Sequence, residues 1–395
     1  MAKQEIQNGV SKGFRGGCLA LLAILVFSAS VQAQASRLPR LDRAYQHIEH
    51  PIDDSEQWRS ILGDDPALSQ SSLPEMLAQQ SPVRDQGERS TCSIFSAVAW
   101  MESYFIRNAR PAAAEAPDFS EEWLEYLAVR RSTEDGSEAP TNFSLIARHG
   151  LASEAVLPYR NEDWTGLPKR LTGLRRERCG HLNGVRKRES CLITHFDPDA
   201  LDWTDEQLEG SPAAELLLAR RDSDNMLARL KERAGGEWPR ATAVKTVSEV
   251  KALLRAGIPL VLDLDFFLGA WNYDDPELPE ISTSPKQWRQ GIVGYPEKDS
   301  MDRKLSKKGE YGHSVLCVGY DDNIEVETRS RMKDGSMKSF RYRGVYFFKN
   351  SWGTDGFGKR FYAQGVSAPG YGMITQKYAH EFGGFFRARL PESKL

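Results

Sequence analysis

The sequence predicts an α+β fold, because its helical and strand-like patterns occupy different parts of the chain instead of alternating. In the first half, apolar residues recur at spacings of four, three and four, the stripe of a helix with one buried face. These residues are Ile94, Val98, Met101 and Phe105. In the second half, short apolar runs are separated by polar turns, a pattern typical of buried strands.

Three helices are predicted in the first half. Cys92 opens the first helix, since Ser90 and Thr91 immediately before it are good N-cap residues. A second helix is predicted over 121–130 and a third over about 143–149, where a glycine follows as a C-cap.

Residues 160–240 are rich in charge and in helix-forming residues, so they predict a mostly helical insertion. Its charge runs at 175–178 and 186–189 can dock an acidic partner or simply form a solvated face, and the pattern favours the solvated face. No internal repeat is visible in the chain.

After residue 245 the pattern changes from helical spacing to short apolar runs. A helix is predicted over 247–255, and strands are predicted at 258–264, 313–320 and 345–349. The polar segment 324–343 lies between the last two strands and has Asp334-Gly335 at its centre, which is a strong hairpin signal. Whether this hairpin overhangs a site or only faces solvent is left open.

Composition excludes several classes of protein. The 395 residues are 40% hydrophobic and 27% charged, which is ordinary for a globular protein. A formal net charge of −3 provides no basic field for a nucleic-acid backbone, so we expect no nucleic-acid partner. No segment after the amino terminus is apolar enough for stable membrane insertion. The oligomeric state is not indicated.

The amino terminus predicts export. Residues 1–33 combine basic residues, an apolar run of about a dozen residues and a small-residue end, the order of a signal peptide. We therefore expect a secreted protein, located in a periplasm or outside the cell. Residues 34–72 are polar and predict an extension, either a pro-segment that blocks a cleft or an irregular strap.

Export implies an oxidising compartment, where paired cysteines form disulfides. The cysteines after the signal peptide are Cys92, Cys179, Cys191 and Cys317. Cys179 and Cys191 enclose a short basic loop, so we predict a disulfide between them. The alternative is a zinc cluster with His181 and His195, whose spacing matches none of the usual zinc patterns. Cys317 lies in an apolar run and is expected to be a buried hydrophobe.

Cys92 is therefore left as a candidate nucleophile. A thiol at a helix N-terminus feels the positive end of the helix dipole, which favours the thiolate. The Cys92 backbone N–H is unpaired at that position and can point at a developing oxyanion. Gln86, six residues upstream, can offer its side-chain NH2 as a second donor.

Three segments then resemble the motifs of papain-like cysteine proteases. Gln86-Gly87 to Cys92, followed by Phe95-Ser96-Ala97, resembles the nucleophile segment of that family. Tyr311-Gly312-His313-Ser314-Val315-Leu316 is similar to its histidine strand, and Lys349-Asn350-Ser351-Trp352-Gly353 to its asparagine motif. Weaker similarity lies at 119–121 and in the segment that ends at Pro158-Tyr159.

The chain also departs from the family pattern. Arg89 stands where the family has an upstream structural cysteine, so that cysteine's disulfide is absent. Ser93 replaces an aromatic residue beside the nucleophile. His313 and Asn350 follow Cys92 by 221 and 258 residues, and insertions account for these long separations.

The resemblance implies a papain-like two-lobed α+β fold with an active-site cleft between the lobes. A helical lobe over 73–250, containing the insertion 160–240, would carry the nucleophile. A β-barrel-like lobe over 251–395 would carry the histidine and asparagine.

The resemblance also implies a cysteine-type peptidase that hydrolyses peptides or proteins through a thioester, with no metal and no cofactor. The implied catalytic residues are Cys92, His313, Asn350 and Gln86. Cys92 would be the nucleophile, His313 the acid and base, Asn350 the group that orients His313, and Gln86 an oxyanion donor. Two alternatives remain: a transpeptidase or transamidase that uses the same residues, and a non-catalytic peptide-binding module.

Overall fold

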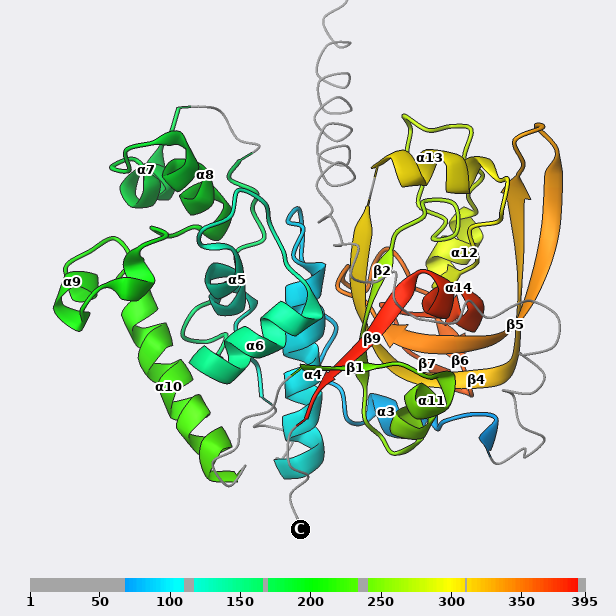
Figure 1. Ribbon diagram of the computed structural model, residues 1–395, viewed down its shortest axis with the longest axis horizontal. Coiled ribbons are helices and arrows are strands. Elements are labelled where there is room, and N and C mark those ends of the chain that lie inside the picture. Colours follow the sequence, from blue (N-terminus) through cyan, green and yellow to red (C-terminus); the bar gives the residue numbers. More distant parts are fainter. Residues whose placement is uncertain (1–67, 110–116, 166–169, 234–240, 310, 390–395) are drawn as a thin grey trace, which may run out of the picture.

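The computed structural model describes residues 68–109, 117–165, 170–233, 241–309 and 311–389 (Figure 1). Helices α4 (Cys92–Ala109) to α10 (Glu215–Arg233) gather on one side and the main sheet with its short bordering helices on the other, so the α+β class and the two-lobed arrangement are confirmed. The expected signal peptide, residues 1–33, and most of the extension 34–72 lie outside the described residues. No helix in the described part of the chain is long and apolar enough to cross a membrane.

The helical lobe is built around α4 (Cys92–Ala109), which contacts α5 (Glu121–Val129) and α6 (Ala139–His149). Ser120 caps α5 by accepting a hydrogen bond from the Trp123 N–H at 3.0 Å. Helix α6 ends at Gly150, whose φ of +71° and close approach to a backbone carbonyl leave no room for a Cβ. The three helices predicted from the sequence are therefore present.

The segment 160–240 is mostly helical where it is described. It contains α7 (Gly173–Cys179), α8 (Val185–Thr194), a 3₁₀ turn (Ala200–Asp202), α9 (Asp205–Glu209) and α10 (Glu215–Arg233). The predicted disulfide between Cys179 and Cys191 joins α7 to α8. These two sulfurs are bonded to each other, so the alternative of a zinc cluster at this loop is not supported.

The other lobe contains a seven-stranded sheet in the order β1-β9-β2-β4-β5-β8-β3. The strands are β1 (Ala241–Val244), β2 (Leu260–Asp265), β3 (Ile292–Val293), β4 (Gly312–Arg331), β5 (Met337–Lys349), β8 (Tyr371–Thr375) and β9 (Gly383–Ala388). Strands β6 (Tyr362–Ala363) and β7 (Val366–Ser367) form a separate pair. Because β1 and β3 are its edges, the main sheet is open and is not a closed barrel.

Strands β4 and β5 form the predicted hairpin, which projects from the sheet (Figure 1). Its turn is closed by the Met332 N–H donating to Ser336 O at 2.8 Å, and Gly335 adopts a φ of +84°. Toward the centre of the sheet, β4 pairs with both β2 and β5. His313 is the second residue of β4, opposite Leu264 of β2, while Asn350 follows directly after β5.

Short helices border the sheet: α3 (Leu73–Leu77), α11 (Val247–Arg255), α12 (Pro285–Gln290), α13 (Met301–Gly309) and α14 (Gln376–Glu381). The chain just before α3 is attached to β4, since the Ser71 N–H donates to Tyr320 O at 3.0 Å and the Asp322 N–H donates to Ser69 O at 2.8 Å. The last residues of the segment 34–72 thus run along the sheet.

The two lobes meet where α4 packs against β2 and β4. The Trp100 indole N–H donates to Pro259 O at 2.7 Å, and the hydroxyls of Ser96 and Ser314 lie 2.6 Å apart. These contacts hold the first turns of α4 against the strand that carries His313.

Candidate active site

Cys92 is the first residue of α4 and is buried at the junction of the lobes. The Thr91 carbonyl accepts the first helical hydrogen bonds, from Ile94 N at 3.0 Å and Phe95 N at 3.1 Å. The backbone N–H of Ser314 donates to the Cys92 sulfur. The fold therefore brings the thiol next to the residue that follows His313, although 221 residues separate Cys92 from His313 in the sequence.

His313 is buried and forms a defined hydrogen bond to Asn350. Its Nε2 lies 2.9 Å from Asn350 Oδ1, which also accepts a hydrogen bond from the Ser351 N–H at 2.9 Å. An amide oxygen can only accept, so Nε2 carries the proton and the neutral ring has its lone pair on Nδ1. Nδ1 has no hydrogen-bond partner in the described part of the chain.

Aromatic rings surround His313 and shield it from water. Trp352 stacks on the imidazole at 4.5 Å between ring centroids, while Trp271 and Phe266 meet it edge-on at 5.1 and 5.8 Å. Burial in this apolar setting lowers the pKa of His313 to about 4, although the hydrogen bond to Asn350 acts in the opposite direction. The neutral imidazole is therefore the favoured form.

The thiol of Cys92 is also held in its neutral form. Burial raises the pKa of Cys92 to about 12, and this outweighs the hydrogen bonds from Ser314, Ser93 and its own backbone, which lower the pKa. The expectation of a thiolate favoured by the helix N-terminus was therefore wrong for this closed site, because burial dominates. The resting pair is a thiol and a neutral imidazole.

Gln86 lies beside the start of α4 with a fixed amide orientation. Its Oε1 accepts from the Ser351 hydroxyl at 2.7 Å, and its Nε2 donates to Arg89 O at 2.6 Å. The second amide hydrogen has no acceptor among the residues that the structure describes. Because Oε1 is held by Ser351, the nitrogen faces the segment that leads to Cys92.

The loop from Gln86 to Thr91 is braced by a residue to which sequence reasoning gave no role. The Tyr159 hydroxyl donates to Gln86 O at 2.9 Å and lies 2.8 Å from Thr91 Oγ1. One hydroxyl thus joins Gln86 to the residue before Cys92. Its only signal in the sequence was the Pro158-Tyr159 pair.

Arg89, three residues before Cys92, is the centre of a buried ion cluster. Its guanidinium lies 2.8 Å from Glu122 and 3.4 Å from Asp135, and it donates to Ile193 O at 2.9 Å. The side chain is only 1% exposed. Electrostatic contacts therefore join the nucleophile segment to α5 and to the insertion.

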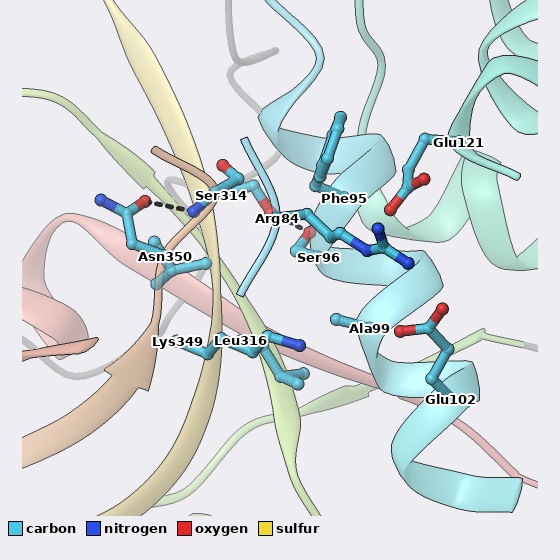
Figure 2. A pocket seen from close by; sticks show the side chains of 12 residues that line it. Arg84, Phe95, Ser96, Ala99, Glu102, Glu121, Ser314, Leu316, Lys349 and Asn350 are labelled. Atoms are coloured by element: carbon cyan, nitrogen blue, oxygen red, sulfur yellow. Dashed lines mark hydrogen bonds between the residues drawn. The ribbon is translucent and has the colours of Figure 1, made fainter. Parts of the chain in front are cut away.

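A second polar network connects the lobes behind the site. Figure 2 shows Lys349, the residue before Asn350, extending from β5 toward α4, which carries Glu102. Lys349 Nζ donates to Ser81 O and Oγ, both at 2.8 Å, and the Ser81 hydroxyl in turn donates to Glu102. This chain of hydrogen bonds links the strand that precedes Asn350 to the helix that begins with Cys92.

The four sequence-predicted residues thus lie on segments that the fold brings together at one junction. Asn350 contacts His313 directly, Gln86 reaches Asn350's neighbour Ser351, and Cys92 reaches His313's neighbour Ser314. Within the described residues, no group of three or more His, Cys, Asp or Glu side chains has the arrangement of a metal site.

The two-lobed α+β fold agrees with the fold that the resemblance to papain-like cysteine proteases implies. Among solved structures, the chain is similar to xylellain, a cysteine protease from Xylella fastidiosa, with a TM-score of 0.47 and 16% identity over 89% of this chain and 99% of that one. It is also similar to digestive procathepsin L2 from Tenebrio molitor, with a TM-score of 0.44 and 16% identity over 91% and 80% of the two chains.

A third similar structure is bromelain from Ananas comosus in complex with the E64 inhibitor, with a TM-score of 0.39 and 14% identity over 82% of this chain and 99% of that one. No protein-family model and no curated protein matches the sequence. The function proposed below therefore rests on the residues of this chain.

Proposed function

We propose that the protein is an exported cysteine peptidase of the papain-like type, which hydrolyses peptide bonds through a thioester. The observation that supports this proposal most is the environment of His313. Its Nε2–H is committed to Asn350 and its Nδ1 lone pair is left without a partner, while the next residue in β4 donates to the Cys92 sulfur.

In the first half-reaction, the Cys92 thiol passes its proton to His313 Nδ1 as the sulfur attacks the substrate carbonyl carbon. The Cys92 backbone N–H and the second amide hydrogen of Gln86 donate hydrogen bonds that stabilise the negative charge developing on the carbonyl oxygen. The C–N bond then breaks, and the imidazolium gives its proton to the leaving amine. The products are a free amine and an acyl thioester on Cys92.

In the second half-reaction, His313 Nδ1 removes a proton from water as the oxygen attacks the thioester carbonyl. The C–S bond breaks, the sulfur recovers the proton from His313, and the acid is released. Throughout both steps, Asn350 keeps Nδ1 directed at the reacting atoms, because its Oδ1 can accept only from Nε2–H. Trp352 keeps water away from this hydrogen bond by covering the ring.

A thiol-directed epoxide inhibitor tests this assignment directly. The purified protein, with and without residues 34–67, would be incubated with the epoxide and mapped by mass spectrometry. Cys317 is the internal control, because it is a second buried free thiol with no histidine assigned to it. We expect labelling at Cys92 and none at Cys317. Labelling at Cys317 alone, or at neither cysteine in either form, would overturn the assignment.

The same experiment bears on residues 34–72. If this segment is a pro-segment, its presence slows labelling, whereas an irregular strap leaves the rate unchanged. Product analysis separates hydrolysis from amine transfer: ligated peptides without hydrolysed ones would indicate a transpeptidase. A Cys92→Ala variant that retains full biological function would instead indicate a peptide-binding module.

A further inference from the structure

A pocket of about 350 Å³ adjoins the candidate active site, next to Gln86. One wall is aromatic and belongs to the sheet lobe; it consists of Phe266, Tyr273, Trp288, Trp352 and Phe357. Trp288 stacks on Trp352 at 5.6 Å, and Tyr273 meets Trp288 edge-on at 5.7 Å. These ring contacts make the wall continuous and hold its shape without a ligand.

The position of this wall indicates which part of a substrate would reach it. Trp352 stacks on His313, and Phe266 meets the same imidazole edge-on. His313 is the group that protonates the leaving amine in the proposed reaction, so the amine departs beside these rings. The pocket therefore receives the residue that follows the scissile bond.

The segment of the helical lobe that lines the pocket carries negative charge, and it adjoins the aromatic wall where Asp85 forms a β-bridge with Trp352. It includes Asp85 and Glu88, whose side chains are exposed, and neither carboxylate forms an ion pair with a residue that the structure describes. The one basic residue of the lining is Arg89, whose guanidinium is buried among Glu122 and Asp135. The exposed charged side chains of the lining are thus carboxylates, of which Asp85 also accepts a hydrogen bond from the Gly87 N–H at 2.9 Å.

On these observations, and resting on the proposed function, we propose that the pocket selects a long basic side chain, arginine or lysine, on the residue after the scissile bond. The methylene stem would lie on the aromatic wall, with the cation over the ring faces. The charged end would reach the carboxylates of Asp85 and Glu88. Arginine suits such a site best, because its planar guanidinium stacks on rings and pairs with carboxylates.

The test uses internally quenched peptides that differ only at this residue, which is arginine, citrulline, phenylalanine or alanine. Citrulline has the shape of arginine without its charge. We expect kcat/KM for arginine to exceed that for citrulline about tenfold at low salt, the combined effect of a cation–π contact and a partly exposed ion pair. The ratio should shrink at high salt because the carboxylates are exposed.

Two variants test whether the preference for arginine comes from residues of this pocket. Glu88→Gln should lower the arginine-to-citrulline ratio of kcat/KM about threefold or more. Trp288→Leu should lower kcat/KM for the arginine and citrulline peptides more than for the alanine peptide, because only the long side chains would lie on the ring. Asp355→Asn is the matched control, since Asp355 is an exposed carboxylate that does not line this pocket. Equal rates for arginine and citrulline, or a preference for phenylalanine over arginine, would overturn the proposal.

Failure of the proposed function has a different signature. If no peptide is cleaved, the side-chain preference of the pocket can still be measured. The affinity of Cys92→Ala for each of the same peptides would be determined by fluorescence anisotropy. Tighter binding of the arginine peptide than of the citrulline peptide would support the pocket assignment, and equal binding would reject it. If the wild type cleaves the alanine peptide, the peptidase assignment stands even where the arginine and citrulline peptides are cleaved at equal rates.

Discussion

His313 Nε2 and Asn350 Oδ1 lie 2.9 Å apart, and this hydrogen bond decides which nitrogen of the imidazole is available for chemistry. The Asn350 oxygen is itself held by the Ser351 N–H, so neither partner can rotate without losing a buried contact. The same residue, Ser351, holds the amide oxygen of Gln86 through its hydroxyl. One short segment after β5 therefore orients both His313 and Gln86.

Removing the Asn350 amide should reduce turnover. In Asn350→Ala, His313 loses the acceptor that fixes its tautomer, so Nδ1 presents its lone pair to Cys92 only part of the time. We expect kcat to fall by about 10- to 100-fold, part of the 10²–10⁴ that a positioned acid–base group contributes. KM should stay within about twofold. Steady-state kinetics on a fluorogenic peptide measures both; a large rise in KM with unchanged kcat would contradict this role.

The pH dependence of the reaction should follow the pKa of His313. The imidazole must be neutral to accept the Cys92 proton, so activity is lost as the pH falls through the pKa of His313. Burial places that pKa at about 4, so kcat/KM should be half-maximal near pH 4 and level by about pH 6. A half-maximal point near 6.5, measured between pH 3 and 9, would show that the imidazole is exposed to water during the reaction.

Gln86 should contribute to turnover through its free amide hydrogen. Loss of one oxyanion donor typically costs about 10²–10³ in kcat, and we expect this loss in Gln86→Ala. Ser351→Ala should cost less, because Gln86 remains and only its orientation is relaxed. A peptide aldehyde forms a hemithioacetal with Cys92, and the oxygen of this adduct occupies the position of the oxyanion. The affinity for the aldehyde should therefore fall more in Gln86→Ala than in Ser351→Ala. An unchanged affinity for the aldehyde in Gln86→Ala would assign the oxyanion to other donors.

Tyr159 should act as a positioning residue for the same loop. In Tyr159→Phe, the loop loses the hydrogen bond to Gln86 O and the contact with Thr91, while the ring contact with Phe95 remains. We expect kcat to fall by about three- to tenfold, the effect of one net hydrogen bond of about 1 kcal/mol.

The control for Tyr159 is Tyr126→Phe. Tyr126 is a buried tyrosine whose hydroxyl also makes two hydrogen bonds, to Asp197 O and from the Leu201 N–H, but away from the candidate site. Both variants should lose similar stability in urea denaturation, and only Tyr159→Phe should lose kcat. An equal fall in kcat in the two variants would show that Tyr159 acts only through the stability of the fold.

Features that depend on neighbours in the sequence could be predicted from the sequence. The helix that begins at Cys92 follows from its N-cap residues and its apolar spacing, and the β4–β5 hairpin follows from Asp334-Gly335. The disulfide between Cys179 and Cys191 follows from their short separation in an exported chain. Each of these signals lies within about 20 residues, so no knowledge of the packing was needed.

Features that depend on packing could not be predicted. The neighbours of Arg89 in the sequence do not indicate its ion cluster, because its partners Glu122, Asp135 and Ile193 lie between 33 and 104 residues away. The neutral form of Cys92 was missed for a related reason. The helix N-terminus is visible in the sequence, whereas the burial that outweighs it comes from the sheet lobe packing over α4.

The Arg89 cluster leads to a prediction about stability. Burial alone would raise the pKa of Glu122, but Arg89, His195 and the backbone N–H of Arg160 lower it to about 2. Arg89→Met keeps a long unbranched side chain but removes the cation that Glu122 and Asp135 share, which leaves Glu122 with its hydrogen bond to His195. Breaking a buried ion pair by removing one partner typically costs about 3–5 kcal/mol, and we expect a loss of this size at pH 7 in urea denaturation.

The sign of the pH dependence separates this electrostatic role from simple packing. Glu122 has a folded pKa below its unfolded value, so in the wild type its contribution is present above about pH 4.5 and is lost as the pH falls toward 2. In Arg89→Met the carboxyl becomes easier to protonate than in the unfolded chain, and protonation removes the unpaired charge. The difference in stability between wild type and variant should therefore shrink between pH 7 and pH 4. A difference that stays constant over this range would show that Arg89 acts through its volume rather than its charge.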